Sequence, residues 1–155
     1  MQTERETAAA TREHVQQVQR KLAWFVREVT FRMIHHDDSK FQDPEFETFR
    51  VFTGKGSTYN SPEYKQFLAE MKPALDHHYA HNSHHPEFFD YGVDGMSLVD
   101  LVEMFCDWWA ASLRYADGSI LRSIDQNTGR FGLSPQLVSI LRNTVRVMGG
   151  EYSED

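Results

Sequence analysis

Apolar side chains recur every three or four positions in the N-terminal part of the chain. This spacing matches the 3.6-residue period of an α-helix and predicts a helix with one apolar face. We expect residues 1–10, which lack such a pattern, to be frayed. The apolar positions that define the predicted helix are Val15, Val18, Leu22, Phe25, Val29 and Met33.

Three later stretches carry helix start signals. Ser61 followed by Pro62 predicts a helix that Pro73 restarts and that ends near Asn82. Ser97 and Asp100 form a variant of the capping box before an apolar run that extends to residue 116. The last helix is expected from Ser134-Pro135 to Gly149-Gly150.

The segments between these helices are rich in turn residues, at positions 52–62, 88–96 and 115–119. No segment alternates between apolar and polar residues with a period of two, so no strand is predicted. The sequence therefore predicts an all-α protein, a compact bundle of five or more helices that forms one domain over residues 1–155.

The composition and charge of the chain limit the classes of function that fit it. The chain has 155 residues and a formal net charge of −7, which argues against general nucleic-acid binding, because phosphate neutralisation needs clustered Lys and Arg. A small anionic substrate fits if metal ions supply positive charge locally. No apolar stretch reaches membrane-spanning length and the N-terminus lacks a signal-peptide pattern, so we expect no membrane contact and a cytoplasmic protein. Cys106 lies in an apolar run, which predicts a buried thiol.

Histidines are concentrated in two places. The chain has eight, with His35 and His36 followed by two aspartates and five more within residues 77–85. Imidazole is a common ligand of borderline metal ions, so these residues predict a metal site. Helical spacing leaves two choices open, His78 with Asn82 or His77 with His81, whereas Pro86 places His84 and His85 on a turn.

The acidic partners can also be interpreted without a metal. Asp107 lies among aromatic residues, and a buried carboxylate there needs a cation or a partner such as Arg114. His36 and Asp37 can equally form a polar helix end, and His77 and His81 can be solvated or can orient true ligands.

"HDDSK", His36 to Lys40, resembles the HDxxK signature of the HD superfamily of metal-dependent phosphohydrolases. That superfamily is all-α and orders its ligands H…HD…H…H…D, and the chain offers the same order. "EHV", "HDDSKF", "PEF", "HHYAHNSHHPEFF" and "EMFCDWWA" also look like a family of short, uncharacterised HD-like proteins of phages and bacteria. The residues that follow the ligand order are His14, His36, Asp37, His78, His84, His85 and Asp107.

The resemblance implies one or two divalent metal ions, drawn from Mn, Fe, Co, Mg or Zn. His14, His36, Asp37 and Asp107 would bind one ion, and Asp37 would bridge to a second held by His78 and by His84 or His85. It further implies attack of metal-activated hydroxide on the phosphorus of a small phosphorylated substrate, most simply a nucleotide, in a bacterial or phage-infected host cytoplasm. Lys40 would contact phosphate, and Glu45 or Glu87 would transfer a proton.

The same ligand order fits two other functions: a di-iron oxygenase and a non-catalytic, metal-stabilised interaction module. A homodimer is compatible with the aromatic-rich helices. If His14 and His36 bind the same ion, the helix between them must bend. The two residues are 22 positions apart, which is about 33 Å along a straight helix. We therefore expect the chain to turn back between Arg27 and Thr30, where β-branched residues weaken the helix.

Overall fold

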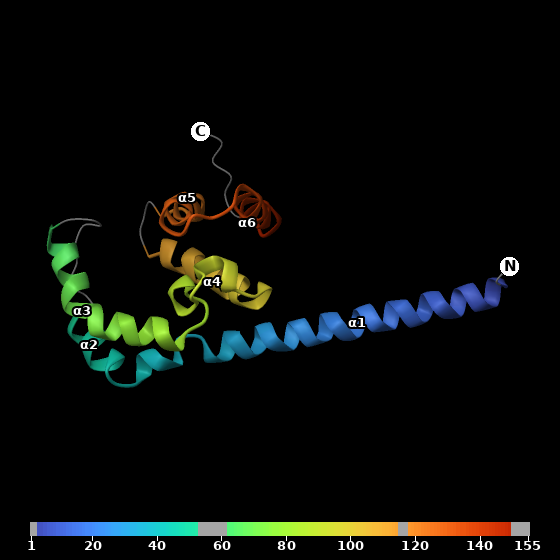
Figure 1. The fold of residues 1–155 in the computed structure, drawn as a ribbon, viewed down its shortest axis with the longest axis horizontal. Helices are drawn as coiled ribbons and strands as arrows, with labels where there is room; N and C mark the ends of the chain where they lie inside the picture. The colour runs from blue at the N-terminus through green and yellow to red at the C-terminus, as the bar shows by residue number, and fades with distance from the viewer. Residues whose placement is uncertain (1–2, 53–61, 115–117, 150–155) are drawn as a thin grey trace. The chain divides into compact units, whose positions relative to one another are not determined.

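The computed structural model describes residues 3–52, 62–114 and 118–149, and over these residues all regular structure is helical (Figure 1). Six α-helices and three short 3-10 helices occur there, which confirms the predicted all-α class. The chain divides into two units, Met1–His36 and Asp37–Asp155, and the prediction of a single domain stays a prediction. Among the described residues no helix has the length and apolar character that crossing a membrane requires.

The first unit is one helix, α1 (Glu4–His35). Thr3 caps it through a capping box, in which the Thr3 hydroxyl accepts from the Glu6 N–H at 3.3 Å and the Glu6 carboxylate accepts from the Thr3 N–H at 2.8 Å. The capping box starts the helix at Glu4, so the expectation that residues 4–10 are frayed is wrong. The expected turn between Arg27 and Thr30 is also wrong, because a β-branched residue costs a helix only a few tenths of a kcal/mol.

The second unit begins with elements that surround the first histidines. They are η1 (Asp38–Phe41), α2 (Glu45–Phe52), α3 (Pro62–His81), η2 (Pro86–Phe88) and η3 (Gly92–Gly95). Pro73 does not restart α3, which continues through it, and Ala74 beside it is fully buried. The expected cap residue Ser61 lies outside the described residues.

Three C-terminal helices hold the apolar core. They are α4 (Leu98–Ser112), α5 (Ile120–Phe131) and α6 (Pro135–Val147), and the starts of α4 and α6 confirm the predicted caps at Ser97 and Ser134. Trp108 lies in this core with its ring parallel to that of Phe131, at a centroid distance of 6.1 Å. The buried core residues are Met104, Phe105, Trp108, Ile120, Ile124, Leu133, Leu141 and Val145.

Cys106 is exposed, which corrects the prediction of a buried thiol. The buried face of α4 contains Met104, Phe105 and Trp108, spaced one, three and four residues apart. Position 106 lies 100° around the helix from Phe105, away from that face.

Asp100 connects the start of α4 to the segment that carries the later histidines. Its Oδ2 accepts from the Ser97 N–H at 2.9 Å and from the Ser97 hydroxyl at 2.6 Å, which completes the predicted capping box. Its Oδ1 accepts from the Ser83 hydroxyl at 2.7 Å. Because Asp100 is buried, both contacts are shielded from water, and the turn before His84 is tied to α4.

We expect Asp100→Ala to lower the free energy of unfolding by about 2 kcal/mol, because it removes a helix cap and a buried hydrogen bond together. Urea denaturation measures this change. Asp76→Ala is the matched control, since Asp76 forms an exposed ion pair with Lys72 and its loss should cost about 0.5 kcal/mol or less. Equal losses in the two variants would contradict a linking role for Asp100.

Candidate metal centre

Asp37 enters the site from an unusual backbone conformation. Its φ is +59°, the left-handed region that non-glycine residues rarely adopt and that aspartate tolerates better than most. Lys40 lies one turn further along η1, and its Nζ is 2.5 Å from Asp37 Oδ2. The lysine thus holds one carboxylate oxygen, and Oδ1 faces the histidines.

The histidines come from the end of α3 and the turn that follows it. His78 lies in the last turn of α3 and is 2% exposed, and His84, in the turn, is also 2% exposed. His85 is half-buried and has the extended backbone that the following Pro86 imposes, as the sequence predicts. The Ser83–Asp100 contact fixes this turn next to α4.

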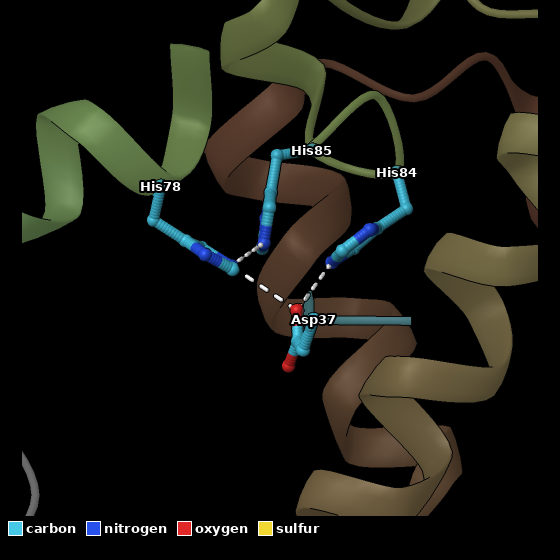
Figure 2. Close-up of side chains that lie close together, drawn as sticks. All are labelled: Asp37, His78, His84 and His85. Carbon is cyan, nitrogen blue, oxygen red and sulfur yellow. Dashed lines mark hydrogen bonds and ion pairs between the residues drawn. The ribbon is translucent and has the colours of Figure 1, made fainter. Parts of the chain in front are cut away.

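Four side chains of the second unit meet at one point (Figure 2). His78 Nε2 and His84 Nε2 each lie 3.4 Å from Asp37 Oδ1. His78 Nε2 is 2.9 Å from His85 Nε2. One ligand atom of each of these four residues lies within 4.8 Å of the others, a spacing that allows one metal ion to bind them all.

Glu45 fixes the proton position on His78. The Glu45 side chain is 0% exposed, and its Oε2 lies 2.8 Å from His78 Nδ1. The neighbouring Asn82 amide donates its hydrogens to Ser39 Oγ at 2.7 Å and to the His78 carbonyl at 2.8 Å. Ser39 Oγ in turn donates to Glu45 at 3.1 Å. His78 Nδ1 is therefore left as the donor to Glu45, and Nε2 carries the lone pair that faces the cluster.

Glu103 fixes the position of the proton on His84. Its Oε1 lies 3.2 Å from His84 Nδ1, so this nitrogen is the donor and Nε2 carries the lone pair that faces Asp37. Two carboxylate–histidine pairs therefore orient the two buried imidazoles. This arrangement is typical of histidines that bind metals, where the outer carboxylate fixes the ring and raises its basicity.

Three atoms that can offer a lone pair to a metal ion lie close together: His78 Nε2, His84 Nε2 and Asp37 Oδ1. Burial lowers the pKa of His78, and Lys40 lowers it further, which favours the neutral imidazole that can bind a metal ion. Burial, followed by His84 and His78, lowers the pKa of His85 to about 3. The residues present fit a divalent cation, which can accept from all of these atoms at once.

The structure adds one acid to this cluster. Carboxylate oxygens of Asp107 and Asp37 lie within 4.8 Å of one another, as the ligand order predicts. Asp107 is half-buried on α4, and Glu103 lies four residues before it on the same face of that helix. Glu103 is not among the residues predicted from the sequence, although its spacing from Asp107 is the signal that could have found it.

The other predicted site residues are His14, His36 and Glu87, followed by Glu45 and Lys40. His14 and His36 belong to the first unit, and because α1 is continuous they lie about 33 Å apart. The prediction that they share one ion within a chain is therefore wrong, and His36 alone stays a prediction. Glu87 is paired with Arg130 at 2.6 Å.

Glu45 is unsuited to the proton transfer predicted for it. Its side chain is fully buried, and both carboxylate oxygens accept hydrogen bonds from histidines. These contacts favour an orienting role. Lys40, with a side chain 34% exposed, lies beside Asp37 and retains access to solvent.

One family model matches residues 3–147, which is most of the chain and includes every residue of this cluster. The chain belongs to the Family of unknown function (DUF5662). No curated protein and no solved structure matches it. Membership of this family carries no assigned activity, so the chemistry of the site rests on its own geometry.

The lowered histidine pKa values predict acid sensitivity of the metal-free protein. An unfolded histidine has a pKa near 6.5, so between about pH 6.5 and 3 the unfolded state binds more protons than the folded state. We expect the free energy of unfolding to fall as pH is lowered through this window, by up to about 1.4 kcal/mol per pH unit for each histidine.

Urea titrations in the presence of chelator at pH 7 and pH 5 measure this loss. His85→Gln should make the decrease shallower, whereas His35→Gln, at an exposed position, should leave it unchanged. Carboxylates titrate in the same window and are common to all three proteins, so the difference between variants is the informative quantity. Identical slopes for all three would contradict a buried neutral His85.

We expect Glu103→Gln to weaken divalent-metal binding about 10- to 100-fold without removing a ligand, because glutamine accepts from His84 Nδ1 more weakly than a carboxylate does. Isothermal titration with Zn²⁺ or Mn²⁺ measures the affinity. Glu47→Gln is the control, as Glu47 pairs with Arg50 on the exposed side of α2. An affinity equal to that of the unmodified protein would show that Glu103 does not support a ligand.

Proposed function

We propose that this chain is a divalent-metal-dependent phosphohydrolase that acts on a small phosphorylated substrate, with nucleotides as the first class to test. One observation carries the proposal: His78 Nε2, His84 Nε2 and Asp37 Oδ1 converge beside the ammonium group of Lys40. The convergence supports a cation, and the lysine supports an anionic ligand next to it.

Asp37, His78, His84 and His85 would hold the cation, and Asp107 would add a carboxylate on the Asp37 side. Nitrogen and oxygen donors of this kind suit Mn²⁺, Fe²⁺, Co²⁺ or Zn²⁺. His78 and His84 are buried, whereas Asp37 and His85 are half-buried. The half-buried side is consistent with a site that keeps a position for a substrate, as catalytic metal sites do.

A bound divalent cation of this kind polarises a phosphoryl oxygen and lowers the pKa of water. The chain's own residues provide the positioning. Lys40 is held by Asp37 Oδ2 and lies over the Phe49 ring, 5.6 Å from its centroid, so its charge is fixed next to the site. In a protein with a net charge of −7, this local cation favours a phosphate that the rest of the surface would repel.

We expect the Mn²⁺- or Co²⁺-loaded protein to release phosphate from at least one member of a panel of nucleotides and sugar phosphates. Chelator should abolish the release, and added metal should restore it. Asp37→Asn should lower kcat/KM by about 100-fold or more, because it removes the charge shared by the cation and Lys40. Lys40→Gln should mainly raise KM for the phosphorylated substrate.

Asp76→Asn, on an exposed part of α3, is the control variant and should retain full activity. A protein that binds metal stoichiometrically yet releases no phosphate from the whole panel would contradict the proposal. Bound iron with oxygen consumption would indicate the oxygenase alternative instead. Metal-dependent stability with neither reaction would indicate the non-catalytic module.

A further inference from the structure

His77 and His81 form a second histidine pair, outside the cluster described above. They lie four residues apart in α3, and their rings are stacked with a centroid distance of 4.0 Å and an interplanar angle of 20°. His81 is exposed and the His77 side chain is 32% exposed. Residues at this spacing share one helix face, so both rings reach solvent side by side.

Hydrogen bonds determine which nitrogen of each ring carries the lone pair. His77 Nδ1 lies 2.7 Å from Glu45 Oε1, and His81 Nδ1 lies 2.7 Å from the backbone carbonyl oxygen of His77. A carboxylate and a carbonyl can only accept, so both Nδ1 atoms are donors. Both Nε2 atoms therefore carry lone pairs, at the ends of two adjacent rings.

Two oriented imidazoles at positions i and i+4 of a helix are a bidentate chelate for a transition-metal ion. Imidazole favours Zn²⁺, Ni²⁺, Co²⁺ and Cu²⁺, whereas Mg²⁺ and Ca²⁺ prefer oxygen ligands. The Glu45 contact resembles the carboxylate that orients a metal-binding histidine and raises its basicity. Water would fill the other positions, since the pair is open to solvent.

We propose that His77 and His81 bind one transition-metal ion on the surface of α3, at a site separate from the internal centre. The two sites share a single buried residue. Glu45 Oε1 contacts His77 and Glu45 Oε2 contacts His78, so one carboxylate orients a ligand of each site. This sharing gives the proposal a signature that an unrelated surface histidine would lack.

Titration of the full-length protein with Zn²⁺ by calorimetry, and with Cu²⁺ by electron paramagnetic resonance, tests the proposal. His81→Ala should remove one bound ion per chain, and His77→Ala should remove the same one. His84→Ala should instead remove binding at the internal centre and leave the surface ion in place. His35→Ala controls for an exposed histidine without a histidine partner four residues away.

The orienting carboxylates separate the two sites further. Glu45→Gln should weaken both classes of binding, by about 10- to 100-fold each, whereas Glu103→Gln should weaken only the internal class. The Cu²⁺ spectrum of the surface site should show nitrogen coupling that His81→Ala reduces. If His77→Ala and His81→Ala both leave the number of bound ions and this coupling unchanged, the proposed site does not exist.

The result of the surface titration does not depend on the proposed hydrolase activity. Loss of the surface ion in His81→Ala, together with full phosphate release, would support two separate sites. Absence of phosphate release would leave the surface titration unaffected, because His77→Ala and His81→Ala remove no ligand of the internal centre.

Discussion

The hydrogen bonds of Glu45 are the interaction on which the site depends. A carboxylate that is fully buried is costly unless every oxygen accepts hydrogen bonds, and Glu45 meets this condition through His77, His78 and Ser39. The requirement holds α2 against α3, since the two histidine donors lie more than thirty residues along the chain from Glu45. The same bond forces the His78 proton onto Nδ1. The hydrogen bonds of Glu45 that pack α2 against α3 therefore also orient the His78 ring.

With these protons fixed, His78 Nε2, His84 Nε2 and Asp37 Oδ1 lie close together as possible metal ligands. Burial lowers the pKa of His78 and of His85, so both favour the neutral imidazole that can bind a metal ion. Lys40 reaches Asp37 Oδ2, on the other oxygen of that carboxylate. A divalent cation interacts favourably with two imidazole lone pairs and Asp37 Oδ1 together, and this set of donor atoms is the geometric support for a metal.

The helices predicted correctly were those with local signals. Ser97 with Asp100 and Ser134 with Pro135 mark their helix starts through backbone hydrogen bonds that depend only on neighbouring residues. The elements α2 and α5 were not predicted, because α2 has only eight residues and α5 is largely polar with a glycine near its end. The expected break in α1 failed for a different reason. It came from the requirement that His14 and His36 meet, and the β-branched residues between Arg27 and Thr30 weaken the helix too little to bend it.

Within the site, local rules placed some ligands and could not place others. Pro86 dictates the extended backbone of His85, so the turn that carries His84 and His85 follows from the sequence alone. The choice between His77 and His78 does not, because neighbouring residues on a helix point about 100° apart and either can face inward. Glu45 decides it from a distant helix by accepting from both, with His78 buried and His77 partly exposed. A long-range carboxylate thus orients two adjacent histidines on different faces of α3, one in the internal cluster and one in the surface pair.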